Sequence, residues 1–170
     1  MHMLPALPLP ASLETAHGPV QVRRATPGDL PALARLLGDD PISAARGDSG
    51  DIADYRAALD AVLAAPGNDL LVAVDAGGTV VGTLQLTVIP GMARRGATRL
   101  LVEAVRVAST RRSSGIGGAL MRWVMRDAAL ATGAGLVQLT SDAARTDAHR
   151  FYTRLGFADS HIGFKYTVGA

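Results

Sequence analysis

The chain has 170 residues, of which 48% are hydrophobic, 4% aromatic and 19% charged, with a formal net charge of +2 at pH 7. This length fits one domain, the hydrophobic fraction excludes an intrinsically disordered protein, and no apolar run reaches the ~18 residues of a transmembrane helix. Because the sequence contains no cysteine, disulfide scaffolds, cysteine-ligated metal sites and thiol nucleophiles are also excluded.

The N-terminal residues differ from the rest of the chain. Residues 1–18 contain three prolines and no periodic pattern, so we predict a flexible tail there and a single domain over residues 19–170. The tail lacks the basic and long apolar parts of a secretory signal, which favours a cytoplasmic protein. Basic residues are spread along the chain with few aromatic residues among them, so neither a nucleic-acid nor a membrane partner is predicted.

The periodicity of hydrophobic residues divides the domain into strands and helices. Strands show apolar and polar residues in alternation, whereas helices show apolar residues three and four positions apart. In chain order the pattern predicts a strand at residues 20–24, a helix at 30–37, a polar loop at 38–50, a helix at 51–65, a hairpin of strands at 70–74 and 80–89, a strand at 98–107, a helix at 115–131, a strand at 136–140, a helix at 146–155, and two short strands through Val168. This order indicates α/β layering around one mixed sheet.

Residues 100–120 combine the features of an anion-binding site. A strand ends at Val107, a turn contains Arg112, and a glycine-rich run from Gly115 to Gly118 opens the next helix. Unpaired amides of a first helical turn attract a phosphate, glycines let the backbone approach it, and an arginine adds a charge-assisted bond. The alternative is that these glycines serve only tight packing. A Walker A loop and a dinucleotide fingerprint are both disfavoured, because Gly-Lys-Ser/Thr is absent and residue 120 is Leu.

Two motifs resemble those of the GNAT superfamily of N-acetyltransferases. Residues 112–117 (Arg-Ser-Ser-Gly-Ile-Gly) are similar to its acyl-CoA signature Gln/Arg-x-x-Gly-x-Gly/Ala, and residues 148–157 are similar to its A-x-x-x-Y-x-x-x-G-F block. The resemblance extends from about Val20 to Val168. It implies an α/β (α+β) fold with a single mixed, largely antiparallel sheet of about seven strands, flanked by about four helices and splayed between strands 4 and 5.

The resemblance also implies an activity. We expect an acetyl-CoA-dependent N-acetyltransferase, an acyltransferase that moves acetyl to a primary amine of a small molecule by direct attack in a ternary complex. The lack of cysteine supports this route over a cysteinyl acyl-enzyme. Alternatives are a protein Lys or N-terminal acetyltransferase, or a non-catalytic acyl-CoA-binding sensor. Acetyl-CoA is the expected co-substrate, no metal is expected, and a homodimer is expected because superfamily members often dimerise through their sheets or C-terminal strands.

Cofactor contacts are carried over from the family residue by residue. In the family, backbone amides of the signature cradle the diphosphate, and the pantetheine arm pairs with the main chain in the gap between the splayed strands. Arg145 stands where many members have Asn, which leaves its contact open. The resemblance thus implies cofactor contacts from Val105, Arg106, Val107, Arg112, Ser113, Ser114, Gly115, Ile116, Gly117, Gly118, Arg145 and Tyr152.

Tyr152 and Glu103 are the candidate catalytic residues. Tyr152 matches the family's usual general acid, which protonates the leaving thiolate, and its alternative role is aromatic packing under the sheet. Glu103 lies within an apolar strand, on the same face as Val105 and Val107 if no bulge intervenes. There it would be a buried base, or an anchor for the substrate ammonium. Otherwise it pairs with a neighbouring arginine (Arg99 or Arg106) or is exposed at a sheet edge.

The acceptor pocket is expected to come from residues 38–65 and from the loop around Arg94 and Arg95, and these two arginines favour an anionic group on the acceptor. His149 is an alternative base, and His161 is an alternative residue at the mouth of the pocket.

Overall fold

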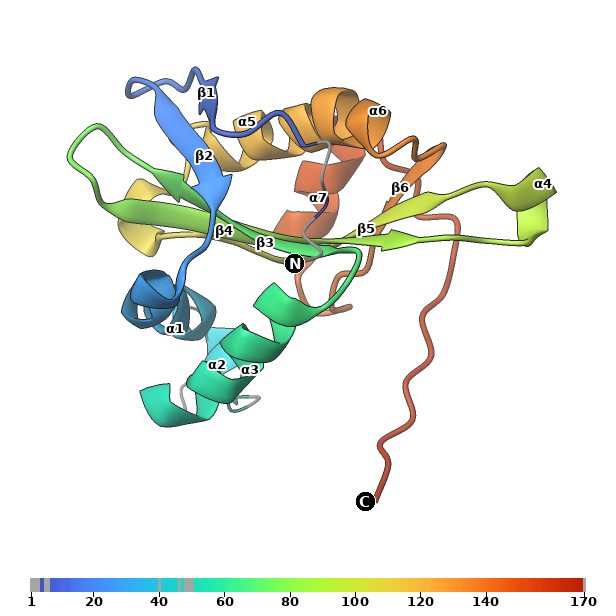
Figure 1. Ribbon diagram of the computed structural model, residues 1–170, viewed down its shortest axis with the longest axis horizontal. Coiled ribbons are helices and arrows are strands. Elements are labelled where there is room, and N and C mark those ends of the chain that lie inside the picture. The colour runs from blue at the N-terminus through green and yellow to red at the C-terminus, as the bar shows by residue number, and fades with distance from the viewer. Residues whose placement is uncertain (1–3, 5–6, 40, 46, 48–50, 170) are drawn as a thin grey trace.

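The computed structural model describes residues 4, 7–39, 41–45, 47 and 51–169, and shows one sheet with helices against both of its faces (Figure 1). The four pairings from β1 to β5 are antiparallel, whereas β5 and β6 are parallel. The expected mixed, largely antiparallel sheet is therefore confirmed, with six strands where about seven were expected. In chain order, which is also their order in the sheet, the strands are β1 (Ala11–Leu13), β2 (Val20–Arg24), β3 (Asn68–Val74), β4 (Val80–Ile89), β5 (Arg99–Val107) and β6 (Leu136–Leu139).

The helices form one layer on each side of the sheet: α1, α2 and α3 cover one face, and α5, α6 and α7 cover the other (Figure 1). None of the helices in the described ranges has the length and apolar character that a membrane crossing requires. In chain order they are α1 (Leu30–Gly38), α2 (Pro41–Ala45), α3 (Ile52–Ala64), the single turn α4 (Ala93–Gly96), α5 (Ile116–Trp123), α6 (Ala129–Ala131) and α7 (Thr146–Arg154).

Two helical predictions have different outcomes. The helix predicted at residues 115–131 is present, because a π-helical turn at Val124–Ala128 joins α5 to α6 without a break. The region predicted as a loop at residues 38–50 contains α2 instead. With only five residues, α2 is too short for a periodic pattern to indicate it.

Two hydrophobic cores hold the layers together. The larger core lies between the sheet and α5–α7 and includes Leu86, Leu100 and Leu120. The smaller core lies between the sheet and α1 and α3 and includes Leu33 and Val72. Since successive residues of a strand point to opposite faces, β3 and β4 contribute to both cores. Each fully buried leucine contributes about 1.5–3 kcal/mol.

A partly buried ion pair lies at the start of α1. Both Nη atoms of Arg23 donate to the Asp29 carboxylate, each at 2.8 Å. The amide and hydroxyl of Thr26 also donate to Asp29, at 2.8 and 2.9 Å. These donors, the Arg23 guanidinium above all, lower the pKa of Asp29 to about 2, so the carboxylate remains ionised far into the acidic range.

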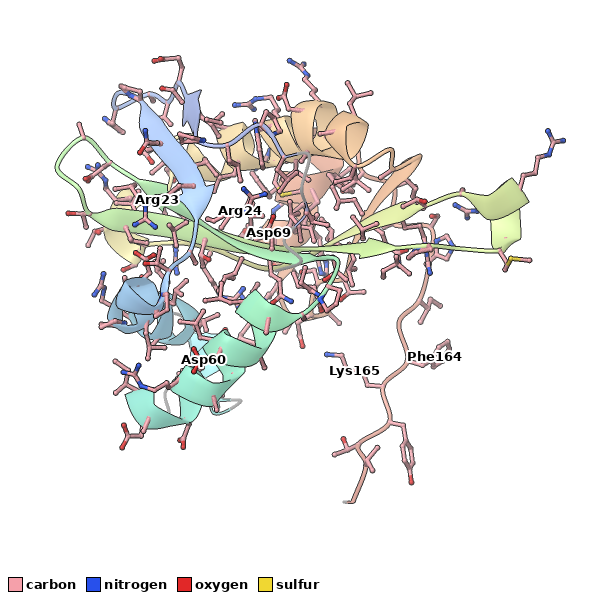
Figure 2. The ribbon with its side chains drawn as sticks, in the orientation of Figure 1. Arg23, Arg24, Asp60, Asp69, Phe164 and Lys165 are labelled. Atoms are coloured by element: carbon pink, nitrogen blue, oxygen red, sulfur yellow. The ribbon has the colours of Figure 1, made fainter. Side chains whose placement is uncertain are left out.

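The N-terminal segment is more ordered than the flexible tail predicted for residues 1–18. Besides β1, Leu4 and Leu7 are buried in the larger core. The amide of Leu4 donates to the Asp69 carboxylate at 3.2 Å, and Arg24 bonds both to this carboxylate, at 3.1 Å, and to the Leu4 carbonyl (Figure 2). The prediction missed this packing because isolated leucines between prolines have no period.

The two short strands expected through Val168 are absent, since residues 157–169 contain neither helix nor strand. A strand requires a neighbouring strand that accepts its hydrogen bonds, and this segment runs away from the sheet (Figure 1).

Candidate active site

β5 carries a bulge in its middle. Thr83 of β4 pairs with Arg106 and Gln85 pairs with Glu103, so two residues of β5 lie opposite one residue of β4. Within the bulge Ala104 has a φ of 50°, in the left-handed region that non-glycine residues rarely adopt. A bulge of this kind bends its strand and redirects the side chains that follow it.

β5 and β6 separate beside this bulge. The two strands pair only from Arg99 to Val102 on β5, which is opposite Leu136 to Leu139 on β6. Residues 103–107 of β5 therefore have no strand partner on that side within the described ranges. Counted from β2, the two strands are the fourth and fifth of the domain, so the expected splay is present.

The bulge changes which face Glu103 occupies. Leu100 and Val102 before it, and Val105 and Val107 after it, all belong to the larger core. The alternation therefore shifts by one residue at Ala104, and Glu103 lies on the opposite face, toward α1–α3. Strict alternation, which placed Glu103 with Val105 and Val107, is wrong for this strand because it holds only in the absence of a bulge.

Glu103 is exposed, not buried as the sequence suggested. Its carboxylate makes no hydrogen bond or ion pair with any residue that the structure describes, and so it is not paired with Arg99 or Arg106. Its cross-strand neighbour Gln85 instead donates to Asn68, at 3.1 Å. The carboxylate is therefore available to a ligand that approaches from the α1–α3 side.

Tyr152 approaches the opening between β5 and β6 from the other face of the sheet. It lies on α7, packs against the larger core, and makes edge-to-face contacts with Phe151 and Phe157, at centroid distances of 5.1 and 5.8 Å. Its hydroxyl has no hydrogen-bond partner in the described part of the chain. Burial raises the pKa of the phenol above its usual value, against the opposing effect of the Arg106 and Arg145 guanidinium groups. Tyr152 is thus a protonated donor at neutral pH.

Two arginines meet at one buried hydroxyl near Tyr152. Arg106 of β5 and Arg145, just before α7, donate to the Ser43 hydroxyl of α2, at 2.9 and 3.0 Å. Arg106 also donates to the carbonyl of Val105, at 2.9 Å. The structure therefore brings two predicted contact residues together at a third, which the sequence did not indicate because Ser43 falls in the predicted loop.

The loop before α5 presents a row of backbone amides. Ser113 and Gly115 have φ values of 62° and 86°, so the chain turns sharply into the helix. Ala119 is the first residue of this helix whose amide donates to a preceding carbonyl, that of Gly115, at 2.9 Å. The preceding amides, those of residues 116–118, have no helical acceptor and point out of the helix start. This is the anion-binding arrangement that the glycine pattern predicts.

Gly117 lies close to both α7 and β5. A Cβ on Gly117 would lie 3.5 Å from the Phe151 ring of α7 and 3.7 Å from Val107 of β5. A side chain larger than alanine at this position would therefore press against these two residues.

The polar side chains of the loop bond within the protein. Arg112 donates to the carbonyl of Asp39 at the end of α1, at 2.6 Å, and the Ser114 hydroxyl donates to the carbonyl of Arg111. Any contact of this loop with an anion would therefore come mainly from its main chain.

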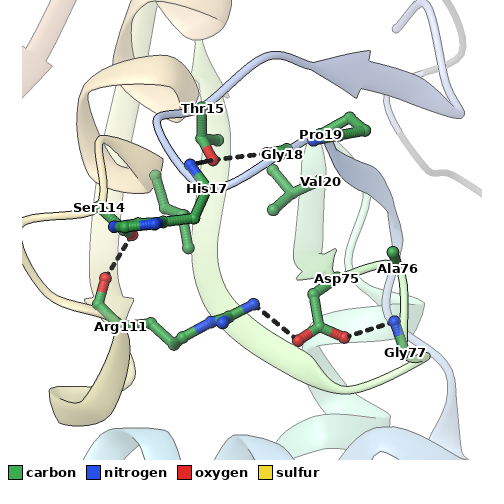
Figure 3. A pocket seen from close by; sticks show the side chains of 11 residues that line it. Thr15, His17, Gly18, Pro19, Val20, Asp75, Ala76, Gly77, Arg111 and Ser114 are labelled. Atoms are coloured by element: carbon green, nitrogen blue, oxygen red, sulfur yellow. Dashed lines mark hydrogen bonds and ion pairs between the residues drawn. The ribbon is translucent and has the colours of Figure 1, made fainter.

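A small pocket borders the same loop on the side of the β1–β2 connection (Figure 3). It is lined by His17, Asp75, Arg111 and Ser114 among others, and Arg111 pairs with Asp75 at 2.9 Å. Its volume of about 120 Å³ is well below the ~300–1,000 Å³ of ordinary ligand sites. The pocket therefore does not fit a cofactor the size of coenzyme A.

The side chains of the two alternative histidines contact neither Glu103 nor Tyr152 in the described part of the chain. His149 is exposed, and its Nε2 lies 2.8 Å from the carbonyl of Asp142. His161 lies on the exposed C-terminal segment, next to Ser160. Across the described ranges, no three acidic or histidine side chains gather closely enough to hold a metal ion.

Comparison with known proteins agrees with this geometry. The profile described as "Acetyltransferase (GNAT) family" matches residues 31–157. A curated relative, the aminoalkylphosphonate N-acetyltransferase of Salmonella typhimurium, is 38% identical over 63 residues, which make up 37% of this chain and 40% of that protein. The matched part thus spans well under half of this relative's length.

Two solved structures share the fold over nearly their whole length. A Bacillus halodurans protein, named a transcriptional regulator, is 37% identical with a TM-score of 0.79, and the match covers 87% of this chain and 99% of that one. An Agrobacterium tumefaciens protein, named provisionally as an acetyltransferase, is 28% identical with a TM-score of 0.72, and the match covers 86% and 98% of the two chains. With the family profile matching most of the domain, the chain belongs to the GNAT acetyltransferase family.

Proposed function

We propose that this protein is an acetyl-CoA-dependent N-acetyltransferase that acetylates a primary amine of a small molecule by direct attack in a ternary complex. One observation carries the proposal: the opening between β5 and β6 has a protonated phenol, Tyr152, on one face and an exposed carboxylate, Glu103, on the other. Family membership and the amine-acetylating relative support the same reaction.

The chain's backbone fits acetyl-CoA, which supplies a thioester when bound. Amides around residues 113–118, above all those of residues 116–118, would hold its diphosphate at the start of α5. The unpaired edge of β5 near Val105 and Val107 would accept the amides of the pantetheine arm, as an added strand does. A main-chain N–H at this edge would also face the thioester oxygen and stabilise the charge that develops there.

Tyr152 acts as the general acid in this proposal. The Tyr152 hydroxyl would donate its proton to the thiolate that leaves after the amine has attacked. The raised pKa keeps that proton in place at neutral pH, and the lack of an internal hydrogen bond leaves the hydroxyl free to turn toward the sulfur.

Glu103 acts on the acceptor side. An amine arrives as ammonium and must lose a proton before it can attack. The exposed Glu103 carboxylate can anchor the ammonium and accept its proton, directly or through water. Because Glu103 faces α1–α3, the acceptor would bind on that face of the sheet.

The acceptor would also carry an anionic group. The relative from Salmonella is named for aminoalkylphosphonates, which combine the two groups. Arg94 and Arg95, which were expected to bind this anion, lie at the tip of the long β4–β5 hairpin (Figure 1).

A thiol-release assay with acetyl-CoA tests the proposal. The amine panel pairs aminoalkylphosphonates and amino acids with alkyl amines of equal length that lack the anion, and adds lysine peptides. Release with small amines supports the proposal. Release with peptides alone would instead indicate a protein acetyltransferase, and tight acetyl-CoA binding with no release for any amine would indicate a sensor. A single domain, which includes the N-terminal strand β1, and a cytoplasmic location are further parts of the proposal.

A further inference from the structure

An ion pair joins the loop before α5 to the turn between β3 and β4. Arg111 ends a 3₁₀ turn at Ser109–Arg111 and donates to the Asp75 carboxylate at 2.9 Å. Asp75 follows directly after β3 and lies 36 positions before Arg111 in the sequence. Figure 3 shows the Arg111 side chain extended toward Asp75. The pair thus connects two distant parts of the chain, and the proposed mechanism gives it no role.

The Asp75 carboxylate is fixed by its own turn. One of its oxygens accepts from the amides of Gly77 and Thr79, each at 3.0 Å, and the other accepts from Arg111. The Asp75 amide also donates to the Thr79 carbonyl, at 2.9 Å. Because these bonds hold Asp75 within the turn, its carboxylate is a rigid anchor, and a hydrogen bond between two charged groups is stronger than one between neutral groups.

The main chain transmits the position of Arg111 to the amides at the start of α5. The Arg111 carbonyl accepts from the hydroxyl of the buried Ser114. Ser114 immediately precedes Gly115, whose left-handed φ turns the chain into the helix. A shift of Arg111 would therefore move Ser114, Gly115 and the amides of residues 116–118 that follow.

A cavity lies beside this part of the loop. The pocket of about 120 Å³ is bordered by Arg111, Ser114 and the β1–β2 connection (Figure 3). An empty space offers no packing contacts against a shift of the loop, so the loop depends more on its directional bonds. The other bonds of the loop, including that from the Ala16 amide to the Ser114 carbonyl at 3.1 Å, each have a main-chain partner. Among the described residues, the pair of Arg111 with Asp75 is the loop's one bond between two side chains.

We propose that Asp75 and Arg111 are positioning residues, whose ion pair keeps the loop before α5 in the shape that binds the diphosphate of acetyl-CoA. The inference rests on the proposed function, because it concerns the same cofactor site. Both residues act through the main chain of residues 111–118 and not by touching the cofactor. Without the pair, the loop occupies its binding shape for a fraction of the time, and the apparent affinity falls by that fraction.

Calorimetry of acetyl-CoA binding to the full chain tests the inference. Arg111→Gln and Asp75→Asn each break the pair, and we expect each to raise the Kd about three- to tenfold. The sign of the effect at Asp75 is decisive: removing a negative charge near an anionic cofactor would by itself tighten binding, whereas loss of positioning weakens it. Arg150→Gln breaks the exposed ion pair of Arg150 with Asp147 on α7, and this matched control should leave the Kd unchanged.

Steady-state kinetics and unfolding separate positioning from a purely structural role. In both variants the KM for acetyl-CoA should rise with the Kd, while kcat at saturating acetyl-CoA stays close to that of the wild type. The Arg111 and Asp75 side chains are 38% and 19% exposed, and ion pairs that are open to water contribute little to global stability. The denaturant midpoint should therefore hardly change. A merely structural pair would lower the midpoint and the amount of active enzyme without raising the KM.

A double-mutant cycle shows whether the two residues act as one unit. Since each substitution breaks the same bond, the double variant Arg111→Gln/Asp75→Asn should bind acetyl-CoA about as well as either single variant. Fully additive losses, tighter binding by Asp75→Asn, or single variants with the wild-type Kd would overturn this inference alone. A wild type that binds no acetyl-CoA would overturn the proposed function and the inference together.

Discussion

Removing the hydroxyl of Tyr152 tests the chemical role of the phenol most directly. Tyr152→Phe retains the ring and its edge-to-face contacts with Phe151 and Phe157. The hydroxyl makes no hydrogen bond with the described residues, so no internal bond is lost. We therefore expect the free energy of unfolding to change by less than about 1 kcal/mol. Any decrease in rate would then reflect the loss of the catalytic hydroxyl and not a loss of folded protein.

The expected loss follows from what a positioned acid contributes. General acid catalysis gives about 10²–10⁴-fold in rate, which corresponds to about 2.7–5.4 kcal/mol of barrier. Because burial raises the pKa of Tyr152 above its usual value, the phenol is protonated across the neutral range. The wild-type kcat should therefore show no decline from this group near neutral pH, and the alkaline limb that this group produces should disappear in the variant.

The assay is thiol release at saturating acetyl-CoA, with acetyl-CoA affinity measured separately by calorimetry. Tyr166→Phe is the matched control, because it removes a phenol hydroxyl that is exposed and far from the opening in the sheet. We expect a reduced kcat with nearly unchanged acetyl-CoA affinity for Tyr152→Phe, and unchanged values for Tyr166→Phe. Equal turnover of the two variants would remove Tyr152 from the acid role and leave it only its packing.

Three further substitutions test other parts of the structure. Gly117→Glu places a negative charge beside the amides that start α5 and should weaken acetyl-CoA binding by about tenfold or more; calorimetry should show no such effect for the control Gly135→Glu, whose Cβ meets only open space. Glu103→Gln should lower kcat if the carboxylate is a base, or raise the KM for the acceptor if it is an anchor. The control Glu14→Gln, at an exposed position, should change neither constant. Unchanged kinetics for Glu103→Gln would exclude both roles. The pKa of Asp29 is about 2 in the folded protein and 3.8 in the unfolded chain, so the carboxylate contributes up to about 2 kcal/mol of stability above pH 4, which is lost as the pH falls toward 2. Denaturant unfolding of Asp29→Asn should therefore show a lower stability at pH 7 and a weaker dependence of stability on acidic pH. A dependence as steep as that of the wild type would refute the assignment.

Patterns that repeat within one element were predictable from the sequence. The helix over residues 115–131 and the hairpin of β3 and β4 follow from the spacing of apolar residues and from the turn glycines. The turn that exposes amides at the start of α5 was also predictable. Gly115 has a positive φ there, and glycine is the residue that adopts such a φ without strain.

Features that depend on distant parts of the chain were not predictable. The bulge at Ala104 gives a positive φ to a residue that has no preference for it, so no sequence signal warned that Glu103 would change faces. Ser43 becomes part of the site only because α2 brings it to two arginines, one of which is 102 positions away in sequence. The segment ending at Val168 has the alternation of a strand, but alternation carries no information about which edge, if any, is available.

The bulge in β5 affects how the amine preference of this GNAT family member can change by mutation. The side chains of residues 103 and 106 face the proposed amine side, and those of residues 105 and 107 face the proposed thioester side. One strand would therefore contact the two substrates through two separate rows of side chains. Preference for a new amine can then be altered in the first row without disturbing the second. Without the bulge, with Ala104 paired as an ordinary strand residue, alternation would carry Arg106 to the face of the larger core and would move Val105 and Val107 to the face of Glu103. The backbone of Ala104 therefore keeps the two sets of side chains apart.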